Sequence, residues 1–230
     1  MINKEFDNAV AAVADIKDGS TLLIGGFGPP GQPTHLIDAL IEVGSRDLTV
    51  INNNACAGGD AIARLFQLDR VRKVVCSFPK AIGSTVFDEL YLAGKIELEL
   101  VPQGSLAERI RAAGAGIAGF YTRTAVGTEL AEGKETKEFD GFLYVLETAL
   151  KADFALIKAH AADRWGNLVY RKTARNFGPI MATAAETTIA EVENVVPLGG
   201  LDPESIVTPG IYIDRFIATS VLDNEKRLAK

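Results

Sequence analysis

Short apolar runs alternate with helical hydrophobic periodicity through the first half of the chain, and this alternation constrains the fold more than any other feature. Strands are predicted at residues 21–24, 48–51, 73–76 and 96–101, and helices at 35–43, 60–67, 85–93 and 106–113. Phe6, Val10 and Val13 mark a further helix ahead of them. Parallel strands need crossover connections, and crossing helices cover the faces of the sheet. The sequence therefore predicts an α/β fold with an open, mainly parallel sheet and helices on both faces.

The second half of the chain is less regular. Residues 114–133 are rich in Gly, Ala and Thr and residues 134–140 are charged, which predicts a long loop or an excursion from the main body. Strand-like runs return at 142–146, 154–158, 168–170, 188–192 and 211–213. No shift in composition, repeat or low-complexity tract marks a linker. We therefore expect a single domain over residues 1–220, followed by a polar tail over 221–230.

Composition narrows the class of protein. A hydrophobic content of 47% with 23% charged residues is typical of a globular domain, and a net charge of −6 argues against nucleic acid as a partner. Cys56 and Cys76 lack the C-x-x-C spacing, so neither a disulfide framework nor a metal site is expected. No apolar run approaches the ~20 residues of a membrane helix, and the N-terminus does not resemble a signal peptide. We therefore expect a cytoplasmic protein with no membrane partner.

A glycine-rich loop follows the first predicted strand and precedes the first crossover helix. It consists of Gly25, Gly26, Phe27, Gly28, Pro29, Pro30 and Gly31. Glycines at such a place let the backbone come close to a ligand. We expect Thr34 to cap the helix that follows, and the partial positive charge of that helix N-terminus suits a phosphate or a developing oxyanion.

The same loop contains the G-x-G-x-x-G pattern of dinucleotide sites, but its context disfavours that function. Prolines at 29, 30 and 33 remove amide donors and constrain the backbone where the helix of that motif should begin. The second strand ends in Asn52, Asn53 and Asn54, whereas a ribose-binding site needs an acidic residue there.

Polar residues lie just past the ends of several predicted strands: Asn53 and Asn54, Ser77, and Gln103. Because the carboxyl ends of parallel strands meet at one edge of a sheet, we expect them to share a crevice with the glycine loop. Gln103 is either an oxyanion donor held between Pro102 and Gly104 or an ordinary loop residue, and the residues alone leave both open.

The other polar residues are interpreted as structural. Ser105 and Glu108 match a capping box for the next helix. Glu97 and Glu99 alternate with apolar residues, as on the solvent face of a strand. His35, His160 and the Glu193-Asn194 pair show no catalytic or metal-ligand spacing, and there is no G-x-S-x-G elbow. A site with donors but no nucleophile indicates an incomplete enzyme or a binding module.

The chain resembles the A (alpha) subunits of family I coenzyme A transferases in a series of short stretches. The match begins at Asp18-Gly19, Gly25-Gly26-Phe27, Gly31 and Pro33 and runs nearly end to end. Further matching stretches are Asn53-Asn54-Ala55, Val101-Pro102-Gln103-Gly104, Gly127-Thr128, Asp153-Phe154-Ala155, Gly166-Asn167, Ala174-Arg175-Asn176-Phe177 and Thr208-Pro209-Gly210. Residues 71–80, 86–91 and 163–172 are most similar to the members that move CoA from succinyl-CoA to 3-oxoadipate, while members acting on acetoacetate share much of the same frame.

The resemblance implies an enzyme that works only with a B subunit, in a heterotetramer of two A and two B chains. Such enzymes use a ping-pong route in which a B-subunit glutamate, in a Ser-x-Asn-Gly-like context, becomes a glutamyl-CoA thioester. This chain has no counterpart of that motif. Coenzyme A is then a co-substrate, and neither a tightly bound cofactor nor a metal is expected.

Carried over to this chain, the resemblance assigns roles to particular residues. The loop from Gly25 to Gly31 would bind coenzyme A, Gln103 would donate to an oxyanion, and Asn53 and Asn54 would line the acyl pocket. Lys80 is our candidate for the far carboxylate of 3-oxoadipate, with a solvated surface lysine as the alternative. The chain departs from the family pattern at Pro29-Pro30 and at residues 56–60. A stand-alone acid- or nucleotide-binding module, or an isomerase or deaminase with its own acid and base, remain the rival functions.

Overall fold

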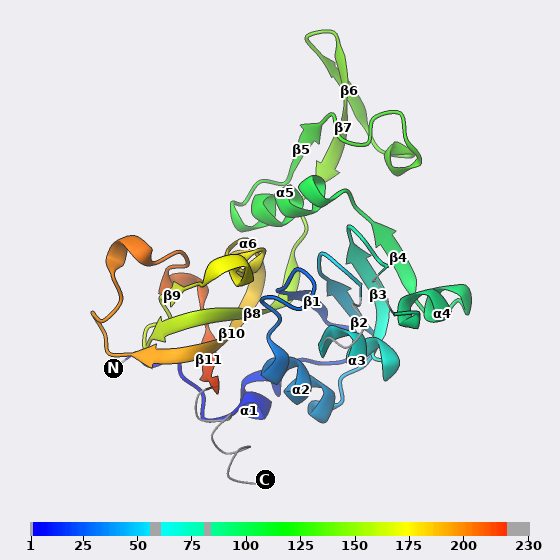
Figure 1. Cartoon of the computed structure of the whole chain (residues 1–230). Coiled ribbons are helices and arrows are strands. Elements are labelled where there is room, and N and C mark those ends of the chain that lie inside the picture. The colour runs from blue at the N-terminus through cyan, green and yellow to red at the C-terminus, as the bar shows by residue number, and fades with distance from the viewer. Residues whose placement is uncertain (1, 56–60, 81–83, 220–230) are drawn as a thin grey trace.

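The computed structural model describes residues 2–55, 61–80 and 84–219, and the chain folds around an eight-stranded sheet (Figure 1). The strands run in the order β11-β10-β8-β1-β2-β3-β4, and β9 pairs with β8. Every pairing within this order is parallel, and only β9 is antiparallel to its neighbour. The strands are β1 Thr21–Ile24, β2 Leu48–Ile51, β3 Val71–Cys76, β4 Glu97–Leu100, β8 Ala152–Asp163, β9 Leu168–Val169, β10 Ala185–Val196 and β11 Arg215–Ala218. The predicted mainly parallel α/β sheet is confirmed.

The strand order reverses direction at β1. From β1 the chain builds β2, β3 and β4 outward on one side, and the later strands β8, β10 and β11 extend the sheet on the other side. In register, Leu22 pairs with Val50 of β2 and with Phe154 of β8. Ligands of open α/β sheets bind outside the carboxyl ends of the strands at such a reversal. The loop that leaves β1 therefore occupies the place where a ligand is expected.

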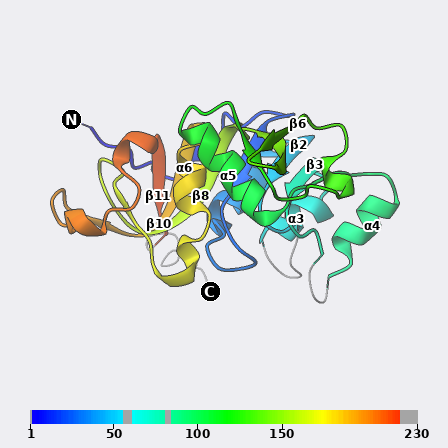
Figure 2. The same cartoon turned by 90° about the horizontal axis from the view of Figure 1, so that it is seen from above.

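Alternating side chains along the central strands build two cores, one on each face of the sheet. Leu22 and Ile24 point into the first core, whereas Leu23 between them points into the second. The first core is covered by α1 Ala9–Val13, α2 Thr34–Val43, α3 Ala61–Gln67 and α4 Val86–Leu92. The second is covered by α5 Gln103–Gly114 and α6 Gly178–Ala182. Helices on both faces are thus confirmed, and the view from above shows α5 and α6 crossing the sheet (Figure 2).

The segment over 114–140 is an excursion from the main body and not the long loop that was the other alternative. The segment contributes β5 Gly119–Thr122 and β6 Thr136–Phe139, which flank β7 Phe142–Thr148 in a three-stranded antiparallel sheet. This small sheet projects from the body beyond α5 (Figure 1). Asp140 and Gly141 join β6 to β7 with φ values of +51° and +77°. Asp-Gly at a two-residue turn is a strong hairpin signal. It indicates a hairpin here, although the flanking segment is charged and exposed and lacks the apolar alternation of a strand.

The predicted strand at 211–213 was wrong. Gly210–Tyr212 forms a short 3-10 turn (η4), and the edge strand β11 begins only at Arg215. Pro209 leads into this turn with φ −61° and starts the tighter geometry. Three more 3-10 turns lie at η1 Glu129–Ala131, η2 Lys172–Arg175 and η3 Pro203–Ser205. The predicted tail over 221–230 falls outside the described residues. Among the helices that the structure describes, none has the length and apolarity needed to cross a bilayer.

Candidate functional site

The glycine loop leaves the carboxyl end of β1 and is fastened to two other parts of the chain. Gly25 N donates to Leu156 O of β8 (2.8 Å), and Gly26 N donates to Asn176 Oδ1 (3.2 Å). At the tip, Phe27 N donates to Pro30 O (3.1 Å), so the two prolines form a tight turn. The loop is therefore a fixed feature of the sheet edge.

Gly31 explains why the loop needs glycine. It adopts φ +84°, and a Cβ there would lie 2.5 Å from Ala174 O and 2.6 Å from Asn176 Nδ2. Asn176 also donates from Nδ2 to Pro30 O (2.9 Å), so its amide holds both ends of the loop. Asn176 belongs to a stretch that resembles the family, but the sequence indicates no role for it because its partners lie about 150 positions earlier in the chain.

A chain of amide hydrogen bonds joins Gln103 to the glycine loop. Gln103 Nε2 donates to Asn53 Oδ1 (2.9 Å), Asn53 Nδ2 donates to Asn54 Oδ1 (3.0 Å), and Gly28 N donates to the same Asn54 oxygen (3.1 Å). Ser77 Oγ donates to Asn53 Oδ1 as well (2.8 Å). Asn53 is buried, whereas Gln103 is exposed. The structure therefore brings together the loop, the asparagines, Ser77 and Gln103, as expected from the strand ends.

Asn52 supports this network from below, a role that the sequence did not suggest. Its Oδ1 accepts from Asn54 N (2.8 Å), and its Nδ2 donates to Ile24 O (2.5 Å) at the end of β1. The side chain is buried and connects the ends of β1 and β2. The run of three asparagines is evident in the sequence, but which of its members faces inward depends on the pleat of β2.

The N-terminus of α2 does not serve an external anion, contrary to our expectation. Thr34 is the first helical residue, Pro33 occupies the cap position, and no side chain of either caps the helix. The carboxylate of Glu191 on β10 instead accepts from His35 N (2.7 Å) and Leu36 N (3.4 Å). Glu191 is fully buried, and Lys158 Nζ lies 3.3 Å from its other oxygen. The positive end of α2 is thus neutralised from within the protein.

The predicted capping box at Ser105 and Glu108 was wrong as well. Helix α5 begins at Gln103, two residues earlier than Ser105, with Pro102 in the cap position and no side-chain cap. Ser105 lies buried in the first turn, and Glu108 Oε2 accepts from Arg111 Nε (2.8 Å). Pro102, at φ −52° and lacking an amide hydrogen, lies directly before this earlier start. Gln103 is therefore held by a helix rather than by a loop.

The side chains of the remaining candidates make no hydrogen bond to the network among the described residues. Lys80 is exposed, and its Nζ lies 3.9 Å from Asp88 Oδ1. His160 Nδ1 contacts Glu193 Oε2 (2.8 Å), and His35 Nδ1 lies 3.3 Å from the buried Glu191, which supports the structural interpretation of both histidines.

Glu99 is not simply solvent-facing, because it contacts Lys73 and Arg109 at 2.9 Å each. Burial raises its pKa, but these two cations outweigh burial and leave the pKa below its usual value.

Residues 56–60 lie outside the described residues. No cluster of three potential metal ligands occurs in residues 2–55, 61–80 and 84–219.

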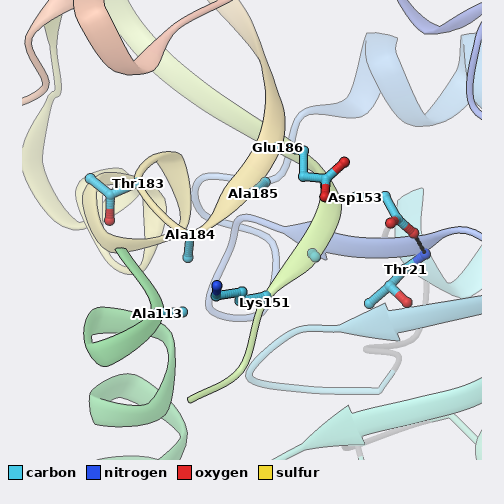
Figure 3. A pocket seen from close by; sticks show the side chains of 9 residues that line it. Thr21, Ala113, Lys151, Asp153, Thr183, Ala184, Ala185 and Glu186 are labelled. Atoms are coloured by element: carbon cyan, nitrogen blue, oxygen red, sulfur yellow. Dashed lines mark hydrogen bonds between the residues drawn. The ribbon is translucent and has the colours of Figure 1, made fainter. Parts of the chain in front are cut away.

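Two cavities lie at opposite edges of the sheet. One, of about 330 Å³, is at the amino ends of β1, β8 and β10, where Asp153 Oδ2 accepts from Thr21 N at 2.7 Å (Figure 3). Lys151 and Glu186 reach its rim, and Asp153 is used in holding β8 to β1. The other, of about 550 Å³, adjoins the glycine loop and is lined by Phe27, Pro30, Lys172, Thr173, Arg175 and Asn176. The carboxyl edge therefore combines a cavity, a glycine loop and convergent donors.

Comparison with known proteins agrees with this geometry. The coenzyme A transferase family model matches residues 6–219. The chain is 63% identical to the A subunit of the 3-oxoadipate CoA-transferase of Pseudomonas putida, over 96% of this chain and 95% of that protein. It is 52% identical to the A subunit of the succinyl-CoA:3-ketoacid coenzyme A transferase of Xanthomonas campestris, over 98% of this chain and 92% of that protein.

A solved structure shares the fold. An acyl-CoA transferase from Escherichia coli, determined as a thioester complex with CoA, superposes with a TM-score of 0.80 at 23% identity. The match covers 94% of this chain but 47% of that protein, so the chain spans about half the length of this structural relative. The parallel sheet reverses its strand order at β1 and carries the glycine loop there, and the family model matches nearly the whole chain. This chain therefore belongs to the coenzyme A transferase family.

Proposed function

We propose that this chain is the A subunit of a CoA-transferase that moves CoA from succinyl-CoA to 3-oxoadipate, together with a B subunit that supplies the nucleophile. The Pseudomonas putida 3-oxoadipate enzyme supports the acceptor, because its A chain and this one are 63% identical over nearly their whole lengths. With this acceptor, the reaction would serve the catabolism of aromatic compounds in the cytoplasm. We further propose two A and two B chains in the assembly.

One observation carries the proposal of a half-site. Gln103, Asn53, Asn54 and Gly28 form a connected set of donors and acceptors, and the hydrogen bonds that join them run from amide to amide without a carboxylate. An acyl-transfer site needs both a nucleophile and donors for the oxyanion. In the proposed mechanism this chain supplies the donors, and a partner supplies the nucleophilic carboxylate.

The proposed chemistry proceeds by two successive acyl transfers at the partner's glutamate. Its carboxylate attacks the thioester carbonyl of succinyl-CoA, the C–S bond breaks, and a mixed anhydride and a CoA thiolate form. The thiolate attacks the glutamyl carbonyl, succinate leaves, and a glutamyl-CoA thioester remains. The acceptor carboxylate reverses both steps. Each addition passes through a tetrahedral oxyanion, which preorganised donors stabilise.

We propose Gln103 as one of those donors. Its Nε2 carries two hydrogens, and donation to Asn53 Oδ1 at 2.9 Å leaves the other for the oxyanion. Asn53 is itself fixed by Ser77 and buried, so the Gln103 amide is oriented before substrate arrives. Such preorganisation is what makes a donor catalytic rather than merely polar.

The choice of acceptor depends on contacts to the part of the acid that is far from the reacting carboxylate. 3-Oxoadipate carries a second carboxylate away from the reacting end, and burying it requires a cation or several donors. Lys80 follows β3 and remains our candidate, although Asp88 lies near its ammonium group. The alternative is a succinyl-CoA:acetoacetate or acetate:acetoacetyl-CoA transferase, which the Xanthomonas campestris relative supports.

Reconstitution tests the proposal directly. The chain is purified alone and co-expressed with the product of an adjacent reading frame that carries the glutamate motif, and each preparation is assayed with succinyl-CoA and either 3-oxoadipate or acetoacetate. We expect turnover only by the pair, with a higher kcat/KM for 3-oxoadipate. Preference for acetoacetate would establish the alternative acceptor. Ligand binding by the isolated chain, with no turnover by the pair, would instead favour a stand-alone binding module.

A further inference from the structure

The cavity beside the glycine loop is walled by two segments that are far apart in sequence but locked together. Phe27 and Pro30 belong to the loop after β1, and Lys172, Thr173 and Arg175 belong to η2. Asn176 joins them, accepting from Gly26 N and donating to Pro30 O. The cavity walls are therefore preformed, which lowers the entropic cost of binding a ligand there.

The lining combines an apolar wall with a cationic rim. Phe27 is 49% exposed, and Pro30 lines the same wall. Lys172 and Arg175 are exposed on the opposite segment, and within the described ranges no salt bridge joins either of them to a carboxylate. Two such cations at one cavity are notable in a chain with a net charge of −6.

Tyr170 does not supply a counter-charge. Burial raises its pKa to about 12, against the opposing effects of its hydrogen bond with Thr208 and of the nearby Arg175 charge. The phenol therefore stays neutral at physiological pH, and the positive charge of Arg175 is left for a ligand. The chemistry that fits is an anion with several phosphate oxygens attached to an apolar or aromatic body.

The loop also links this cavity to the reacting end of the site. Its cavity-side residues Phe27 and Pro30 flank Gly28, whose N donates to Asn54 Oδ1 in the Gln103 network. A coenzyme A thioester has its reacting carbonyl at one end and its phosphates at the other. A molecule with the carbonyl at Gln103 and its chain along the loop would carry its phosphates toward η2.

We propose that Lys172 and Arg175 bind the phosphate groups of coenzyme A, with Phe27 packing against an apolar part of the same molecule. This inference rests on the proposed CoA-transferase function and extends it to the binding of the far end of the thioester. We expect the two cations to act on substrate affinity and not on the chemical step, because they would contact the phosphates at the far end of the thioester and not its reacting carbonyl.

Truncated thioesters test this division of roles. Arg175→Gln and Lys172→Gln are prepared in complex with the B subunit, then assayed with succinyl-CoA, succinyl-dephospho-CoA and succinyl-pantetheine. Each substitution should raise KM for succinyl-CoA about tenfold or more, the usual effect of losing a charge-assisted contact, while kcat changes far less. With succinyl-pantetheine, which has no nucleotide phosphates, each variant should match the unsubstituted complex. Succinyl-dephospho-CoA shows whether the 3′-phosphate or the pyrophosphate is the group that is bound.

The control is Lys151→Gln, which removes an equal charge from the cavity at the opposite edge of the sheet (Figure 3). It should leave KM for succinyl-CoA unchanged. Equal losses with succinyl-CoA and succinyl-pantetheine, or an unchanged KM for succinyl-CoA in both variants, would overturn the proposal.

Direct calorimetry of CoA binding separates this proposal from the proposed acceptor. If the complex uses acetoacetate instead of 3-oxoadipate but Arg175→Gln still weakens CoA binding about tenfold, the acceptor is wrong and the phosphate site stands. If the unsubstituted complex binds CoA and both variants bind it equally well, the phosphate site is wrong and the transferase function stands. If the complex neither binds CoA nor turns over, both proposals fail.

Discussion

Replacing Glu191 with alanine should destabilise the folded chain, because the substitution leaves a helix N-terminus without its anion and leaves Lys158 with only the more distant Glu193, at 3.9 Å. The Glu191 carboxylate is fully buried and accepts from His35 N at 2.7 Å. A hydrogen bond to a charged group contributes about 1.5–3 kcal/mol, and an anion at a helix N-terminus contributes roughly 0.3–1 kcal/mol. Lys158, whose side chain is 25% exposed, lies 3.3 Å away and adds a smaller share. The expected loss is about 3 kcal/mol, near the lower end of the range for breaking a buried ion pair.

Urea unfolding of the purified chain, followed by far-UV circular dichroism, measures this loss. In thermal unfolding, the same loss of about 3 kcal/mol corresponds to a fall in Tm of roughly 6–12 °C for a protein of this size. Glu191→Gln retains an oxygen that can accept from His35 N and removes the charge, so its loss should be smaller than that of Glu191→Ala.

Glu193→Ala is the matched control on the same strand. Glu193 is 43% exposed, contacts His160 and lies 3.9 Å from the same Lys158, and exposed pairs contribute about 0–1 kcal/mol. A loss below about 1 kcal/mol for Glu191→Ala, equal to that of the control, would refute the reasoning. It would mean that the cost of burying the carboxylate cancels its contacts, and that α2 does not depend on an internal anion.

Further outcomes concern the site. The chain without a B subunit should show no CoA-transferase turnover, and activity of the single chain close to that of the pair would contradict the half-site. Gln103→Ala should lower kcat by a factor on the order of 10²–10³ without loss of fold. Gln103→Glu should also have a low kcat, because a carboxylate repels the oxyanion. A near-normal kcat would make Gln103 a structural residue. Lys80→Met should raise KM for 3-oxoadipate about 10- to 150-fold more than for acetoacetate, and equal small effects would exclude Lys80 from the acceptor site. Gly31→Ala, whose Cβ would lie 2.5 Å from Ala174 O, should weaken CoA binding more than Gly28→Ala, which meets open space; equal effects of the two would show that the loop is not held against η2.

The parallel sheet and its functional edge were predictable because they depend on local pattern. Strands β1 and β2 are short apolar runs, and the sequence between them has the hydrophobic period of a helix. A helical crossover is therefore the expected connection between them. The end of each strand then carries whatever residue follows it, so Asn53 and Gln103 could be placed at one edge of the sheet from sequence alone. The antiparallel sheet was missed for a local reason, because the Asp140-Gly141 turn signal lies within a charged segment that is typical of a loop.

The contacts that orient the site were decided by the tertiary structure. Thr34 and Ser105 both have the chemistry of helix caps, but α2 is capped by Glu191 from β10, and α5 begins at Gln103 because of Pro102. Asn176 holds the glycine loop from a segment about 150 residues away. Helix and strand periods arise from neighbours a few positions apart, and the sequence alone was enough to place them. The partner of a buried carboxylate or amide depends on which strands become adjacent in the sheet, and only the folded chain determines that.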